Sequence, residues 1–251
     1  MNAADQPVAS GDLAVDARTA ELAEALARVE ERVRTACAES GRRRAEITLV
    51  VVTKTFPAAD AVRLAGLGVH ELAENRDQEA APKAAEVAAA GADVRWHFVG
   101  QLQRNKARSV ARYADAVHSV DRQPLVTALD RAATEAGREL DVLLQVDLGG
   151  AAERPGASRG GTAPADVPAL AEAVAGTSAL RLRGLMAVAP READPAEAFA
   201  RLAALADDLR DAHPGATWLS AGMSGDLEQA VAAGATHLRV GSAVLGSRPP
   251  L

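Results

Sequence analysis

Short apolar runs, many of them β-branched, alternate along the chain with longer stretches in which apolar positions recur every three or four residues. The short runs predict strands at 47–53, 69–73, 94–99, 116–120, 142–147, 182–188, 217–220 and 237–240. The longer stretches predict helices at 20–39, 59–65, 122–136, 165–175, 195–212 and 225–233. The strand runs show no regular alternation of apolar and polar residues, which is typical of parallel strands covered on both faces.

Residues at the ends of the helical stretches support these boundaries. Asp194 followed by Pro195 is a typical start, because the carboxylate caps the first turn and proline suits the first helical position. Gly66, Gly137 and Gly234 stand where helices should end.

The alternation of eight predicted strands with helices predicts an α/β protein folded as a single (β/α)8 TIM barrel. A doubly wound open sheet is the alternative. No break in composition indicates a second domain, so we expect one barrel domain at 16–251 after a disordered N-terminal tail at 1–15. The Gly/Pro/Ala-rich segment 149–165 lies between a predicted strand and a predicted helix, which indicates a flexible loop.

Composition narrows the classes of function. The net charge is -6, which argues against a general nucleic-acid binder or a binder of anionic membranes. No run approaches the about 18 consecutive apolar residues of a membrane span, and the N-terminus lacks the pattern of a signal peptide, so we expect a cytoplasmic protein. The single cysteine, Cys37, cannot form an internal disulfide. The histidines lack metal-ligand spacing, so no metal site is expected.

Lysine is scarce in this chain, which contains only Lys54, Lys83 and Lys106. Unlike arginine, lysine can form a Schiff base with an aldehyde once its amine is deprotonated. Lys54 follows the apolar run ITLVVVT, at the C-terminal end of the first predicted strand. Active sites of barrels are built at that end, although position alone fits a solvated loop lysine equally well.

Two segments near the C-terminus predict a phosphate site. The segments 219–226 (LSAGMSGD) and 237–243 (HLRVGSA) each follow a predicted strand and contain small residues, so backbone N–H groups can approach a phosphate. Ser224 and Ser242 add hydroxyl groups, and Arg239 adds a charged donor. Loops after strands 7 and 8 commonly bind phosphate in barrels. With the strand-end lysine, these segments indicate an anchored phosphate beside an amine that can meet an aldehyde.

Specific motifs follow one another in a fixed order along nearly the whole chain. They are LVVVTKTFP, ELAENRDQE, WHFVGQLQRNK, HSVDR, LLQVDLGG, LRGLMAV and LSAGMSGDLEQAVAAGATHLRVGSAVLGSR. In these motifs the sequence resembles the pyridoxal phosphate homeostasis protein family, also called proline synthase co-transcribed homologs, which is related to the N-terminal barrel of alanine racemases. The resemblance implies a barrel of that type that binds pyridoxal 5′-phosphate (PLP) in vitamin B6 homeostasis, with PLP-dependent apo-enzymes as recipients.

The resemblance also implies roles for individual positions. Lys54 matches the lysine that forms the Schiff base, and Asn75 matches a residue lining the cofactor pocket. The positions that match the phosphate site and the adjoining pocket wall are Met223, Ser224, Arg239, Gly241 and Ser242. His97, Gln103 and Asn105 belong to a signature near the pocket rim, with no assigned role.

The chain departs from the family pattern in two places. Ala73 stands before ENR, where the family usually has glycine, and its methyl group could narrow the pocket. The loop after QVD lacks the family's common acidic pattern, which leaves a role for this loop in covering the cofactor in doubt.

A racemase needs two bases on opposite faces of the substrate carbon. Lys54 could serve one face, but alanine racemases take the second base, a tyrosine, from a C-terminal β-domain of the partner subunit. The one tyrosine here, Tyr113, lies in a helical stretch, and no second domain is predicted. We therefore expect a monomeric PLP carrier without catalytic residues. The alternatives are a stand-alone amino-acid racemase-like enzyme and an interaction protein whose cofactor reports metabolic state.

Overall fold

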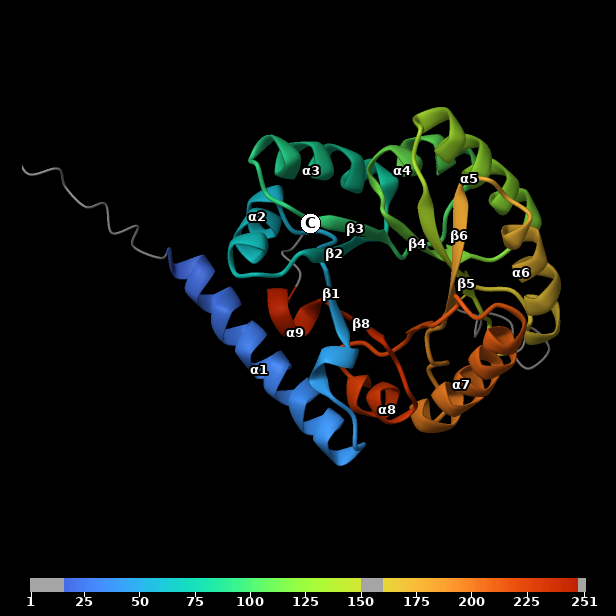
Figure 1. Cartoon of the computed structure of the whole chain (residues 1–251). Coiled ribbons are helices and arrows are strands. Elements are labelled where there is room, and N and C mark those ends of the chain that lie inside the picture. The colour runs from blue at the N-terminus through green and yellow to red at the C-terminus, as the bar shows by residue number, and fades with distance from the viewer. Residues whose placement is uncertain (1–15, 150–159, 248–251) are drawn as a thin grey trace, which may run out of the picture.

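The eight strands form one closed parallel barrel in chain order, seen in the computed structural model, which describes residues 16–149 and 160–247 (Figure 1). The strands are β1 (Thr48–Val52), β2 (Glu71–Glu74), β3 (Arg95–Phe98), β4 (Ala116–Val120), β5 (Leu140–Gln145), β6 (Leu180–Met186), β7 (Trp218–Ser220) and β8 (His237–Val240). Pairing of β1 with β8 closes the barrel, with Thr48 opposite His237 and Val51 opposite Val240. The predicted (β/α)8 barrel is confirmed, and the open-sheet alternative is wrong.

Helices surround this barrel as an outer layer (Figure 1). They are α1 (Ala17–Glu39), α2 (Ala58–Gly66), α3 (Asp77–Ala89), α4 (Ala107–Tyr113), α5 (Gln123–Ala136), α6 (Val167–Ala175), α7 (Pro195–Ala212), α8 (Leu227–Ala232) and α9 (Ser242–Leu245). Within the two described ranges, no helix combines the length and the apolar character that crossing a bilayer requires. The tail expected at 1–15 and most of the loop expected at 149–165 lie outside the described residues.

Capping residues set several helix ends, as the sequence predicted. The carboxylate of Asp194 accepts a hydrogen bond of 2.9 Å from the N–H of Ala196, and Pro195 occupies the first turn of α7. Gly137 ends α5 with φ 64°, a left-handed conformation that glycine adopts without strain. The sequence prediction did not include α3, which contains Pro82, or α4, which is short.

Most of the apolar core lies between the strands and the surrounding helices, where residues such as Leu22, Phe98 and Phe199 are fully buried. A small second cluster, formed by Val50, Val52 and Ala73 with Val99, packs separately from that core. The alternation of strand residues between the two faces of the sheet places this cluster inside the barrel.

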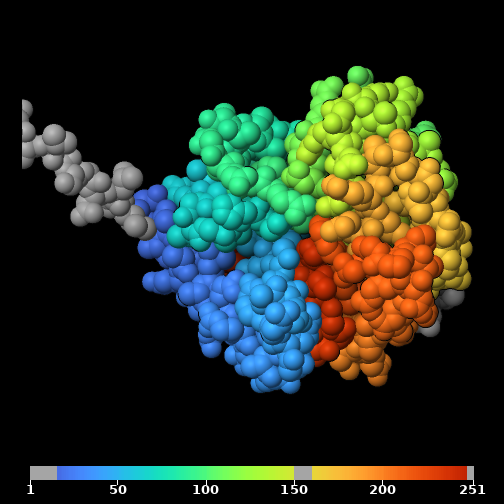
Figure 2. Space-filling view, in the orientation of Figure 1, coloured from blue at the N-terminus to red at the C-terminus, as the bar shows by residue number. Residues whose placement is uncertain are grey.

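The first and last elements of the chain meet on the surface of the molecule. In Figure 2, red C-terminal atoms lie between blue N-terminal atoms and orange ones. Helix α1 packs against α8 and α9. Arg32 of α1 donates to the carbonyl oxygen of Ser224 at 3.0 Å and pairs with Glu228 of α8 at 2.8 Å. Arg18 donates to the carbonyl oxygen of Leu245 at 3.1 Å, so α1 fastens both C-terminal turns.

Candidate functional site

A cavity of about 620 Å³ opens at the C-terminal ends of the strands. Its lining residues are Val52, Lys54, Phe56, Asn75, Val99, Gly100, Val188, Met223, Ser224, Gly225, Arg239, Gly241, Ser242 and Gly246. Every residue that the sequence assigned to the cofactor is among them. The others are valines, glycines and Phe56, which were missed because they carry no reactive group, although all of them stand within the quoted motifs.

Lys54 lies two residues beyond the end of β1, and the backbone on each side of it is held by polar contacts. Lys83 of α3 donates to the carbonyl oxygen of Thr53 at 2.8 Å, and the Thr53 hydroxyl donates to Glu74 at 2.7 Å. Lys83 and Glu74 also form a buried ion pair. On the other side, the N–H of Thr55 donates to Glu79 at 3.3 Å, and Thr55 has φ 69°, an uncommon conformation for a residue with a side chain. The cavity lysine therefore projects from a firmly held segment.

Asn75 and Gly100 bring the ends of β2 and β3 into very close approach. A Cβ atom placed on Gly100 would lie 2.0 Å from the backbone oxygen of Asn75, far inside van der Waals contact. Glycine is therefore required at position 100 for this part of the cavity wall to form.

Two turns from the C-terminal part of the chain meet in the same cavity. The hydroxyl of Ser242 donates to that of Ser224 at 3.3 Å, and the N–H of Ala243 donates to the Ser224 hydroxyl, also at 3.3 Å. The N–H of Met223 donates to Asp226 at 2.6 Å, which fixes the first turn. Met223 is 36% exposed, so it stands at the open edge of the cavity. This pair of hydroxyl groups can donate hydrogen bonds to an anion such as a phosphate.

Arg239 lines the cavity, and two hydrogen bonds hold its guanidinium. It donates from one nitrogen to the Ser220 hydroxyl at 2.6 Å and from another to the carbonyl oxygen of Ala187 at 2.9 Å. Burial lowers the pKa of Arg239 to about 10, so the side chain remains charged at neutral pH. Arg239 is thus fastened to the ends of β6 and β7, and the phosphate-binding role expected for it from the sequence stays a prediction.

Three histidines lie close together inside the barrel. The ring centroids of His97 and His118 are 5.0 Å apart, and that of His237 lies 6.4 Å and 6.3 Å from them. Burial lowers the pKa of His118 well below its usual range, and burial lowers that of His237 to about 3. His97 is 1% exposed and hydrogen-bonds Glu71, so it lies within the barrel and not at the pocket rim.

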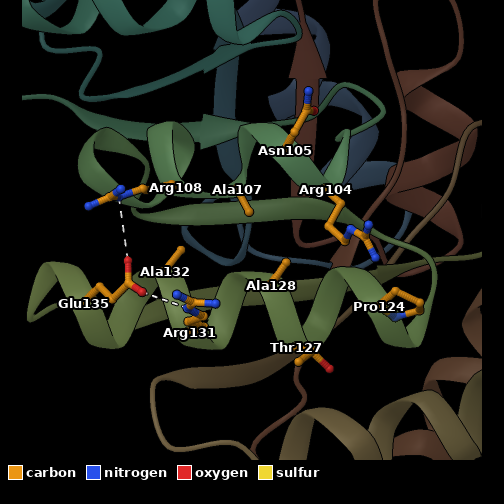
Figure 3. A pocket seen from close by; sticks show the side chains of 10 residues that line it. All are labelled: Arg104, Asn105, Ala107, Arg108, Pro124, Thr127, Ala128, Arg131, Ala132 and Glu135. Carbon is orange, nitrogen blue, oxygen red and sulfur yellow. Dashed lines mark hydrogen bonds and ion pairs between the residues drawn. The ribbon is translucent and has the colours of Figure 1, made fainter.

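Gln103 and Asn105 line two hollows other than the main cavity. Gln103 shares a hollow of about 460 Å³ with Asn75, so it adjoins the main cavity. Asn105 lines a hollow of about 510 Å³ between α4 and α5, in the outer helical layer (Figure 3). In that hollow Glu135 pairs with Arg131 at 2.8 Å and with Arg108 at 3.7 Å. The carboxylate offsets part of the positive charge that the arginines give to the hollow.

Two further residues that the sequence singled out are not among the residues that line the cavity. Ala73 is fully buried against Val50 and Val52 inside the barrel. Tyr113 of α4 packs against the apolar core of the outer layer, where burial raises the pKa of its hydroxyl. In residues 16–149 and 160–247, no group of three or more His, Cys, Asp or Glu side chains is arranged to hold a metal ion.

Comparison with known proteins finds relatives that agree with one another in family. Residues 25–249 match the family model of the alanine racemase N-terminal domain. The pyridoxal phosphate homeostasis protein of Mycobacterium tuberculosis is 44% identical over 245 residues, which cover 92% of this chain and 94% of that protein. The protein of the same name from Escherichia coli is 37% identical over 232 residues, covering 91% of this chain and 97% of that protein.

Solved structures show the same similarity. PipY of Synechococcus elongatus, determined with PLP bound, is 35% identical with a TM-score of 0.76 over 90% of this chain and 100% of that chain. An alanine racemase of Clostridium difficile is 15% identical with a TM-score of 0.68, and this chain covers 58% of it, so that likeness concerns the fold alone.

Proposed function

The chain belongs to the pyridoxal phosphate homeostasis protein family, and from this premise we propose that it binds PLP in the cavity at the C-terminal end of the barrel. The observation that carries the proposal is the meeting of Lys54, from the first strand, with Ser224 and Ser242, from the last two turns, in one cavity. PLP has an aldehyde and a phosphate, and these residues offer an amine and hydroxyl donors. PipY, at 35% identity, was determined with PLP bound.

The residues of the cavity fit this cofactor in other respects as well. Its volume of about 620 Å³ is within the usual range of small-molecule sites. Val52, Val99 and Val188 offer apolar surface to an aromatic ring. A Cβ atom on Gly241 would lie 3.2 Å from the backbone oxygen of Val52, so glycine keeps this part of the wall close to β1.

Each residue has a part in holding the cofactor. Bound PLP supplies an aldehyde that condenses with a primary amine to form a Schiff base. Lys54 offers that amine from a backbone fixed by Lys83 and Glu74. Ser224 and Ser242 orient the phosphate. The two turns that carry them are held by arginines of α1.

We propose that Lys54 acts as a tether and that residues 16–251 work as one PLP-binding domain in cofactor homeostasis. A racemase needs a second base on the opposite face of the substrate carbon. Tyr113, the one tyrosine of the chain, lies in the outer helical layer, and burial raises its pKa. This position supports storage of PLP in preference to amino-acid racemisation, and we propose PLP-dependent apo-enzymes as the recipients of the stored cofactor.

The decisive experiment compares the absorbance spectrum and borohydride trapping of the wild type with those of Lys54→Arg. Arginine keeps the positive charge but cannot form a Schiff base. The wild type incubated with PLP should show a visible band and, after reduction, a covalent adduct on the peptide containing Lys54. Lys106→Arg is the matched control and should behave as the wild type. A band and an adduct that persist in Lys54→Arg would refute the assignment.

A second experiment separates the carrier from the racemase-like alternative. The PLP-loaded protein is incubated in deuterium oxide with a panel of amino acids, and exchange at Cα is followed by NMR. We expect negligible exchange. Rapid exchange accompanied by racemisation would instead favour the enzyme.

A further inference from the structure

A chain of hydrogen bonds runs through the inside of the barrel, from the N-terminal ends of the strands to the cavity at their C-terminal ends. Glu71, the first residue of β2, bonds to His97 Nε2 on β3. His97 Nδ1 lies 2.8 Å from His118 Nε2 on β4. His118 Nδ1 lies 2.9 Å from the hydroxyl of Ser220 on β7, which accepts from Arg239 of β8 at 2.6 Å. Branched apolar residues usually fill a barrel interior, so this polar chain requires an explanation.

The chemistry of Arg239 fixes the direction of every bond in this chain. A guanidinium can only donate, so the Ser220 hydroxyl accepts from Arg239 and its own hydrogen is directed to His118 Nδ1. His118 is therefore neutral, with its hydrogen on Nε2, and donates to Nδ1 of His97. The hydrogen of His97 is on Nε2 and is donated to the Glu71 carboxylate. Each donor then has an acceptor, and the chain ends on a carboxylate.

The opposite direction would leave a buried hydrogen unpaired. If His118 donated from Nδ1, Ser220 would accept from both His118 and Arg239. Among the described residues, the Ser220 hydroxyl has no other hydrogen-bond acceptor, and buried polar groups without partners are rare. The lowered pKa of His118, which follows first from its burial, agrees with a neutral ring.

We propose that Ser220 and His118 are positioning residues of the cofactor site, which fix the guanidinium of Arg239 in the cavity wall through a one-directional hydrogen-bond chain that ends on Glu71. Arg239 is 5% exposed and also donates to the Ala187 carbonyl, so its direction is set on two sides. The inference rests on the proposed function only where PLP binding is the readout.

The first test uses the protein without any ligand. Nitrogen-15 NMR of the histidine side chains, assigned by single His→Gln variants, reports which ring nitrogen carries the hydrogen. At neutral pH we expect neutral rings with Nε2–H in both His97 and His118, and Nδ1 of each as an acceptor. A hydrogen on Nδ1 of His118, or a cationic His97, would overturn the directional chain whether or not PLP binds.

The second test measures PLP affinity by absorbance titration in Ser220→Ala, Ser220→Thr and Ser119→Ala. Ser119 is the matched control, because its buried hydroxyl has no hydrogen-bond partner among the described residues and it adjoins His118 in sequence. Ser220→Ala should weaken PLP binding about tenfold and change the nitrogen-15 shifts of His118, because a hydrogen bond to a charged group is lost. Ser220→Thr should restore both readouts, and Ser119→Ala should resemble the wild type.

The outcomes distinguish the two proposals. Wild-type affinity in Ser220→Ala, or an equal loss in Ser220→Ala and Ser119→Ala, would overturn the positioning role. Failure of the wild type to bind PLP would instead refute the proposed function, while the tautomer measurement on the ligand-free protein would still stand.

Discussion

The ammonium group of Lys83 donates a hydrogen bond of 2.8 Å to the carbonyl oxygen of Thr53, the residue directly before Lys54. The same ammonium pairs with Glu74, whose carboxylate also accepts from the Thr53 hydroxyl at 2.7 Å. Lys83 is 7% exposed and Glu74 is fully buried, so each charge is compensated mainly by the other. One lysine thus fixes the backbone from which another reaches into the cavity.

Replacing Lys83 by methionine should therefore destabilise the protein strongly. The variant leaves the carboxylate of Glu74 buried without its partner, which typically costs about 3–5 kcal/mol. Urea unfolding of the wild type, Lys83→Met and the double variant Lys83→Met/Glu74→Leu measures the effect. The double variant should recover part of the loss, because no buried charge remains. A loss below about 1 kcal/mol in Lys83→Met would contradict the prediction.

The serine pair should matter for the phosphate and not for the rest of the cofactor. Ser224→Ala and Ser242→Ala should each weaken binding of PLP about tenfold, because each variant removes a hydroxyl donor to a charged group. Binding of pyridoxal, which lacks the phosphate, should be unchanged. Ser178→Ala, which alters an exposed serine, is the control. Equal losses for PLP and pyridoxal would show that the serines act through the fold.

Gly100→Ala tests the close approach between the ends of β2 and β3. The added methyl group would meet the backbone oxygen of Asn75 at 2.0 Å, so the cavity wall must shift. We expect a loss of about 1–3 kcal/mol in the free energy of unfolding, together with weaker PLP binding. Gly215→Ala is the control, because nothing lies within 4 Å of a Cβ atom there. The expectation fails if the two variants unfold at the same urea concentration.

The buried histidines should make the fold sensitive to mild acid. The pKa of His237 is about 3 in the folded protein, below its ordinary value of 6.5, because the ring is buried. Between these values the unfolded chain binds more protons than the folded one, so stability is present above pH 6.5 and is lost as the pH falls toward 3. Each such histidine contributes up to about 1.4 kcal/mol per pH unit.

Urea unfolding at pH 7.5 and pH 5.5 measures this dependence. The free energy of unfolding should fall toward the lower pH in the wild type, and the fall should be smaller in His237→Gln. His70→Gln, which alters an exposed histidine, should keep the wild-type dependence. If both variants lose stability with pH to the same extent, burial of His237 is not the cause.

The alternation of strands and helices was sufficient to predict a parallel α/β fold, because parallel strands buried on both faces have a distinctive pattern. The same pattern also fits an open sheet, so the choice of the barrel depended in part on the family resemblance. The motifs around Lys54 and Ser224 likewise named residues that the fold brings into one cavity. The hydrogen-bond chain from Glu71 to Arg239 has no recognisable pattern in the sequence. His118 and Ser220 are 102 positions apart, and only barrel closure brings their side chains within 2.9 Å. The direction of the Arg239 side chain was equally unreadable, because it depends on partners contributed by two other strands.

Pairing of β1 with β8 brings Lys54, which follows β1, close to Ser242, which follows β8. These two parts of the site are synthesised at different times. Lys54 is translated well before Ser224 and Ser242. The contacts of Arg32 in α1 with Ser224 and Glu228 form only after those two residues have been synthesised. A nascent chain therefore presents its amine long before it can hold a phosphate, and the cofactor site is complete only after residue 242 has been synthesised.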